Sequence, residues 1–113
     1  MELNEYQKQA MTTRMRSCDN FSYMFLNLVG EVGEFASKAA KAIRKDDAVI
    51  NGNEYWTTEA LEPLMLEAGD ILWQLAGLCD AFGWTLEQVA EANLAKLASR
   101  KERGVIDGNG DYR

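Results

Sequence analysis

The sequence predicts an all-α fold, a four-helix bundle-type domain that forms oligomers and ends in a short non-helical tail. Four segments carry apolar residues at helical spacing, and short breaks separate them. Proline occurs once in 113 residues, and the only β-like stretch, Ala48–Ile50, is too short to build a sheet. The length fits a single domain over residues 1–113, and an apolar content of 47% allows a packed core.

The first predicted helix covers about residues 3–15, where the apolar positions share one face. The second covers about 20–44, because Asp19 or Asn20 can cap its first turn and basic residues suit the negative end of its dipole. A break at 46–58 contains an Asn-Gly-Asn turn signal.

The third predicted helix covers about 59–82. Pro63 is awkward five residues after the expected cap at Thr58, so we expect the regular helix to start near residue 61. The fourth helix covers about 85–100 and opens with a Thr-x-x-Gln capping box. The glycine-containing residues that follow predict a loop or arm.

The composition excludes several kinds of chemistry. Histidine is absent, which rules out His-dependent nucleophiles and His-based metal sites within one chain. Cys18 and Cys79 lie in apolar, helix-like contexts far apart in the sequence and are expected to be reduced. A metal would therefore have mainly oxygen ligands, which favours Mg²⁺ or Mn²⁺.

The charge and hydropathy restrict the partners. A net charge of −6 disfavours binding to a nucleic-acid backbone. The first residues lack the apolar core of a signal peptide, and no apolar run approaches the roughly 20 residues of a membrane span. We therefore expect a cytoplasmic protein that binds neither nucleic acid nor membrane.

Two acidic pairs are the candidate metal ligands and catalytic residues. On a helical wheel, Glu31 and Glu34 lie side by side at one edge of the apolar stripe of the second helix. Glu67 and Asp70 occupy the corresponding edge of the third helix. Antiparallel packing through the stripes would bring the four carboxylates together, where they would repel one another unless cations shared them.

Glycines beside these acids strengthen the interpretation of the two acidic pairs as a functional site. One E-x-x-E pair alone is usually a solvated helix face. Gly30, Gly33 and Gly69 accompany the two pairs, and each costs a helix about 1 kcal/mol relative to alanine. A cleft or a close approach of helices would explain why they are tolerated.

Four stretches together resemble the MazG-like all-α nucleoside triphosphate pyrophosphohydrolases. They are 30–34 (GEVGE), 67–70 (EAGD), 93–100 (NLAKLASR) and the tail over 103–113, and the similarity spans about 20–113. The resemblance implies Mg²⁺ ions at the acidic residues, which orient a triphosphate and activate a water for attack on the α-phosphorus. The products would be a nucleoside monophosphate and pyrophosphate, with Glu34 as the candidate base.

Five residues are candidates for substrate binding. Asn93, Lys96 and Arg100 share a face of the fourth helix and would bind phosphate, although a solvated basic helix end is the alternative. Lys38 follows the first acidic pair by one turn and is a weaker candidate. Arg113 ends a tail that we expect to fold back across the bundle or a neighbouring subunit and help to close the site.

Two departures from the family and two alternative functions remain. Many members carry an acid where this chain has Gly30, and the stretch over 48–56 is expected to form an extra hairpin or lid. A non-catalytic oligomeric scaffold and a phosphoribosyl-ATP pyrophosphohydrolase-like enzyme are the alternatives. We expect a homodimer or homotetramer, and the sequence does not name the preferred base or sugar.

Overall fold

The computed structural model describes residues 1–113 and confirms the all-α prediction with four helices. A short 3-10 turn and a two-stranded hairpin connect them. The elements are α1 (Leu3–Met11), η1 (Arg16–Cys18), α2 (Phe21–Arg44), β1 (Ala48–Val49), β2 (Tyr55–Trp56), α3 (Thr58–Ala81) and α4 (Leu86–Glu102).

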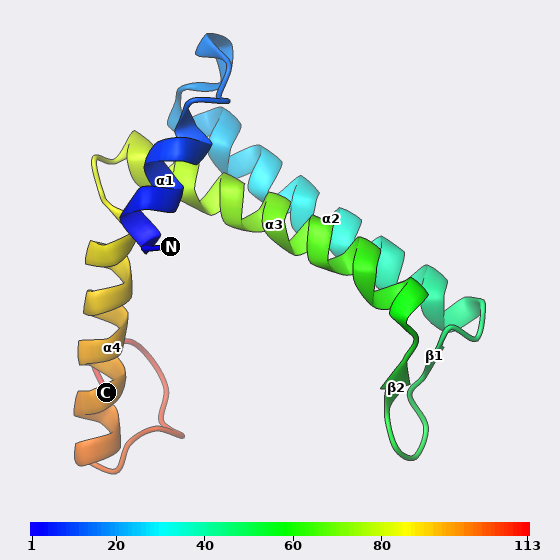
Figure 1. The fold of residues 1–113 in the computed structure, drawn as a ribbon. Helices are drawn as coiled ribbons and strands as arrows, with labels where there is room; N and C mark the ends of the chain where they lie inside the picture. The colour runs from blue at the N-terminus through cyan, green and yellow to red at the C-terminus, as the bar shows by residue number, and fades with distance from the viewer.

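The helices form two arms joined at a corner (Figure 1). Helices α2 and α3 pack side by side in opposite directions, α1 crosses their end at the corner, and α4 runs away from them. The radius of gyration is 17.3 Å, whereas a compact domain of this length would have about 13 Å. Only 13 of the 113 residues are buried, so a single chain covers little of its apolar surface.

Local capping explains where two of the helices begin. Of the two candidate caps for α2, Asn20 is the one used, and its Oδ1 accepts a hydrogen bond from the Tyr23 amide at 2.8 Å. The capping box of α4 is also confirmed. The Thr85 hydroxyl accepts from the Gln88 amide at 3.1 Å, and the Gln88 side chain accepts from the Thr85 amide at 2.9 Å.

The third helix begins earlier than predicted. It starts at Thr58 rather than near residue 61. The N-cap is Thr57 and not the predicted Thr58, and the Thr57 hydroxyl accepts from the Ala60 amide at 3.2 Å. Pro63 therefore lies inside the helix. The prediction was wrong because a proline near a helix start removes a single backbone hydrogen bond, and the threonine cap supports the first turn.

The first helix ends earlier than predicted, at Met11 rather than near residue 15. The hydroxyls of Thr12 and Thr13 each donate to the backbone carbonyl three residues earlier, at 2.6 Å. Such side-chain bonds compete with the helical ladder, which favours ending the helix here.

Polar side chains of α1 hold the corner between α3 and α4. The buried Gln7 side chain donates to the carbonyls of Ala76 and Trp84, both at 3.1 Å, and accepts from the Leu86 amide at 3.0 Å. Asn4, one turn earlier, accepts from the next amide of α4 at 3.0 Å. These contacts bind the first turn of α4 to α1 and help to set the direction in which α4 leaves the corner.

The close approach of α2 and α3 occurs at a glycine that the sequence reasoning did not single out. Met24 is fully buried, and a Cβ added to Gly77 would lie 2.1 Å from its sulfur. By contrast, added Cβ atoms at Gly30, Gly33 and Gly69 would meet no other helix. A close helix approach is therefore wrong as the reason for these three glycines, which leave open space beside the acidic residues.

The structure also bears on the predicted hairpin, on the two cysteines and on membrane-spanning helices. The stretch over 48–56 forms the expected hairpin, in which Ala48 pairs with Trp56 and Val49 with Tyr55, at the end of the α2–α3 arm away from the corner (Figure 1). Both cysteines are free thiols. None of the helices combines the length and the apolarity needed to cross a membrane.

Candidate metal centre

Three carboxylates from two helices converge midway along the α2–α3 arm. Glu31 comes from α2, and Glu67 and Asp70 come from α3 one turn apart. One oxygen from each lies within 4.8 Å of the others. The antiparallel packing of the two helices brings these acids together, as their positions on the two wheels predicted.

The burial of this cluster leaves oxygens without partners. The Glu67 side chain is only 8% exposed, and its Oε1 lies 2.5 Å from the ammonium of Lys38. Its Oε2 and the Oε2 of Glu31 are buried and have no hydrogen-bond partner. A buried, unpartnered carboxylate oxygen is costly unless a cation shares it. The donor set therefore fits a hard divalent cation such as Mg²⁺ or Mn²⁺.

Glu34 lies at the edge of the cluster rather than inside it. Its side chain is exposed and does not belong to the group of three oxygens within mutual reach. It is still near enough to contribute to the raised pKa of Glu31. The four predicted carboxylates are thus arranged as three convergent groups and one outer neighbour, since Glu34 lies farther from the apolar stripe than Glu31.

Lys38 is a cation already within the cluster. Its hydrogen bond to Glu67 raises the pKa of the ammonium, and the charges of Glu34 and Asp70 act in the same direction. A positive charge among clustered acids reduces their mutual repulsion when no metal is bound. A metal ion would compete with this ammonium for Glu67.

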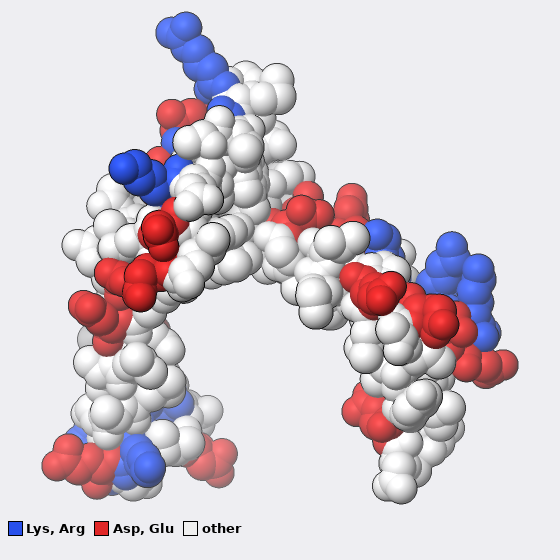
Figure 2. All heavy atoms as spheres, in the orientation of Figure 1, with Lys and Arg blue, Asp and Glu red and all other residues white.

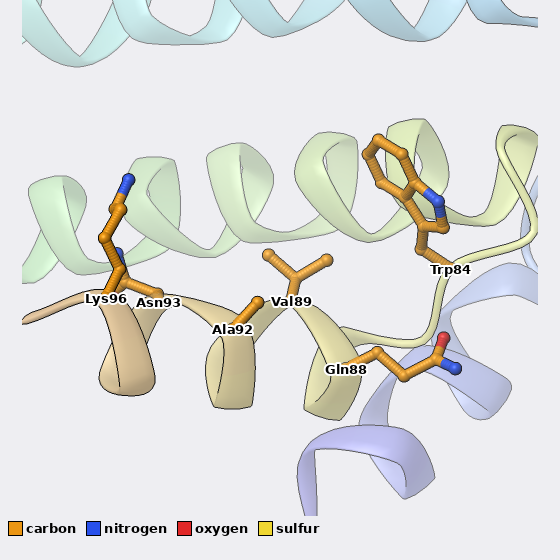
Figure 3. A pocket seen from close by; sticks show the side chains of 6 residues that line it. All are labelled: Trp84, Gln88, Val89, Ala92, Asn93 and Lys96. Atoms are coloured by element: carbon orange, nitrogen blue, oxygen red, sulfur yellow. The ribbon is translucent and has the colours of Figure 1, made fainter. Parts of the chain in front are cut away.

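The predicted phosphate-binding residues of α4 lie on the other arm. Asn93 and Lys96 line a groove of about 460 Å³ that also includes Trp84 and Val89. Figure 3 shows Trp84, Val89 and Lys96 extending from the same side of this segment. Because α4 diverges from α2 and α3 (Figure 1), a single chain does not bring these residues to the carboxylates.

The tail folds back along α4 rather than across the α2–α3 arm (Figure 1). Asp111 accepts from Lys96 at 3.2 Å and from the buried Arg100 at 3.1 Å. The Arg113 guanidinium donates to tail carbonyls, including that of Val105 at 2.9 Å. Within one chain the tail thus folds back onto α4 and not across the bundle, and Arg113 lies against the tail itself, away from the carboxylates. Closure of the site against a neighbouring subunit stays a prediction.

Comparison with known proteins identifies the family of the chain. Residues 20–105 match the family model of the MazG nucleotide pyrophosphohydrolase domain. The chain belongs to the MazG family. The MazG chain is 43% identical over 97 residues to the Gene 37 protein of Mycobacterium phage L5. The aligned residues cover 86% of this chain and 80% of that protein. No solved structure matches it.

The matched span of this MazG protein contains the carboxylate cluster, Lys38 and the whole of α4. It leaves out α1 and most of the tail. Two contacts from outside this span were not predicted from the sequence: the binding of α4 by Gln7 and the pairing of Asp111 with Lys96 and Arg100 of α4. The sequence signal for the pairing of Asp111 was an acidic residue near the end of the tail, because that tail follows three basic residues at the end of α4.

In the metal-free MazG chain, ionisation of Glu31 is expected to lower the midpoint of thermal unfolding as the pH rises above about 4.5. Burial, followed by the charges of Glu34 and Asp70, raises the pKa of Glu31 above its ordinary value of 4.5. A carboxyl whose pKa is higher in the folded state stabilises the fold at low pH, and this stability is lost as the pH rises through the folded pKa. Thermal unfolding in EDTA should show this trend, and Glu31→Gln should flatten it.

The matched control is Glu62→Gln, an exposed acid on α3, which should leave the pH dependence unchanged. The lowered pKa of Asp111, caused first by the Lys96 hydrogen bond and then by that of Arg100, acts in the opposite direction at lower pH. A midpoint that rises steadily towards neutral pH and is insensitive to Glu31→Gln would show that ionised Glu31 does not destabilise the fold.

Proposed function

We propose that this protein is a divalent-cation-dependent nucleoside triphosphate pyrophosphohydrolase, which converts a nucleoside or deoxynucleoside triphosphate to its monophosphate and pyrophosphate. The observation that supports it most directly is the cluster of Glu31, Glu67 and Asp70 with two buried, unpartnered carboxylate oxygens. Its position inside a MazG domain connects the cluster to nucleotide chemistry.

In this proposal Glu31, Glu67 and Asp70 hold Mg²⁺, or Mn²⁺ in its place. Once bound there, the cation would offset part of the negative charge of the triphosphate and make a water more acidic. The residues of the chain supply the remaining functions. Glu34, exposed beside the cluster, accepts a proton from the attacking water at its carboxylate. The water oxygen bonds to the α-phosphorus as the bond from that phosphorus to the bridging oxygen breaks, and pyrophosphate leaves.

The phosphate-binding residues of α4 are proposed to come from a second copy of the chain. Within one chain, Asn93, Lys96 and Arg100 lie on the arm that diverges from the carboxylates. Both arms also leave large apolar side chains more than half exposed, which is typical of surfaces that a partner covers. They include Leu26, Val29, Met65, Leu66 and Leu94.

The expected assembly is a homodimer or a dimer of dimers. The chain mass is 12.7 kDa, so sedimentation at micromolar concentration should give about 25 kDa or twice that value. Mixing two inactive variants, Glu67→Gln and Lys96→Ala, should restore part of the activity, because some mixed dimers would contain one intact site. A monomer, or no recovery on mixing, would contradict shared sites.

The proposed function is tested by incubating the purified chain with a panel of canonical and modified nucleoside triphosphates in Mg²⁺ or Mn²⁺. We expect at least one substrate to give monophosphate and pyrophosphate in equal amounts, and EDTA to stop the reaction. Release of single orthophosphates would mean that the attacked phosphorus is wrong. Inactivity across the whole panel would favour the helical scaffold.

A further inference from the structure

The tail places a carboxylate of the chain itself on two basic side chains of α4. Oδ1 of Asp111 accepts from the Lys96 ammonium at 3.2 Å and from Nη2 of Arg100 at 3.1 Å. Figure 2 shows acidic and basic side chains side by side at this end of the α4 arm. Lys96 and Arg100 are two of the residues that the proposed function assigns to the phosphates of the substrate. In this structure both of them already hold an anion.

The guanidinium of Arg100 is only partly satisfied by this contact. The Arg100 side chain is 6% exposed, and its Nη2 also donates to the Gly110 carbonyl at 3.3 Å. Its Nε is buried and has no hydrogen-bond partner. A guanidinium binds an oxyanion best through two parallel hydrogen bonds, which its Nε and Nη2 can supply together. A single oxygen of Asp111 therefore fills part of a site that a phosphate, with several oxygens, would fill more completely.

Asp111 is weakly held, whereas the loop around it has anchors of its own. The Asp111 side chain is 73% exposed, and exposed ion pairs are weak. The loop is closed by Arg113, which donates to the carbonyls of Val105 at 2.9 Å and Ile106 at 3.1 Å. These bonds do not involve Asp111. Its carboxylate can therefore leave the two bases by rotation of its side chain while Arg113 keeps the loop in place.

We propose that Asp111 is a built-in competitor of the substrate, which occupies Lys96 and Arg100 while the site is empty and is displaced when phosphates bind. The inference rests on the proposed function, because it takes these two bases as phosphate-binding residues. Displacing Asp111 costs part of the binding free energy. The contact therefore weakens the apparent affinity for every triphosphate, in proportion to the fraction of chains in which the bases are free.

The test is calorimetric titration of the full-length protein with inorganic tripolyphosphate in the presence of Mg²⁺, together with the Michaelis constant of the best substrate. Asp111→Asn keeps the size of the side chain and removes its charge. It should lower both the dissociation constant and the Michaelis constant about fivefold, since two exposed ion pairs no longer have to be broken. Circular dichroism and the thermal midpoint would establish that the variant is folded.

The matched control is Asp107→Asn, which removes an exposed acid from the same tail. Asp107 takes part in none of the ion pairs of the structure. The control therefore measures the general effect of removing one negative charge from a chain of net charge −6. Its tripolyphosphate affinity should equal that of the parent. An equal gain in Asp107→Asn would overturn the inference and indicate a long-range charge effect.

Three other outcomes would also overturn it. Weaker binding by Asp111→Asn would mean that Asp111 holds the two bases in position for the substrate. Unchanged binding would mean that it has no part in binding. The third is a lack of tripolyphosphate binding by both the parent and the variant.

Failure of the proposed function gives a different pattern. In that case no nucleoside triphosphate is hydrolysed, yet Asp111→Asn still binds tripolyphosphate more tightly than the parent does. Hydrolysis by the parent, together with an unchanged or raised Michaelis constant in Asp111→Asn, would remove the competitor and leave the function.

Discussion

Replacing Glu67 by glutamine is expected to abolish both Mg²⁺ binding and hydrolysis. Glu67 is the most buried member of the cluster and carries one unpartnered oxygen, so the loss of its charge removes a ligand that no neighbour can replace. Losing about 4 kcal/mol of transition-state stabilisation would lower kcat roughly a thousandfold. Steady-state kinetics with the best substrate measures this effect.

A thermal shift distinguishes metal binding from catalysis. Mg²⁺ at a hundred times its dissociation constant stabilises the folded parent by about 2.7 kcal/mol, and Glu67→Gln should lose that shift. Glu62→Gln, an exposed acid on the same helix, should keep both the shift and the activity. If Glu67→Gln retains them as well, the three carboxylates do not form a metal site.

The second large effect concerns the corner between the two arms. Gln7→Ala should lower the free energy of unfolding by about 3 kcal/mol, because two carbonyls and one amide at the corner lose their partner. The midpoint of thermal unfolding should fall by roughly 10 °C or more. Denaturant unfolding followed by circular dichroism measures both quantities.

Gln9→Ala is the control for this substitution, since Gln9 lies on the same helix and is exposed. It should change the stability by less than about 0.5 kcal/mol. Similar stabilities for the two variants would mean that the Gln7 hydrogen bonds do not hold α4 at the corner.

The sequence predicted the features that depend on neighbouring residues. The caps at Asn20 and Thr85 were readable because each side chain bonds an amide three residues away. The placement of Glu31, Glu67 and Asp70 beside the apolar stripes could also be predicted from the sequence. In a regular helix, the position of a residue fixes the direction in which its side chain points. The start of α3 at Thr58 was not predicted, because Pro63 removes only one backbone hydrogen bond and the helix tolerates that loss.

The tertiary structure decided everything that depends on long separations along the chain. Only the packed helices show that Lys38 reaches Glu67, that Gln7 binds the first turn of α4, and that Met24 fills the space beside Gly77. These contacts join residues 29 to 79 positions apart, and no local periodicity encodes such pairs. The all-α fold and the acidic positions were therefore determined by the sequence itself. The divergence of α4, which separates the two halves of the proposed site within one chain, depends on how side chains far apart in the sequence pack at a single corner.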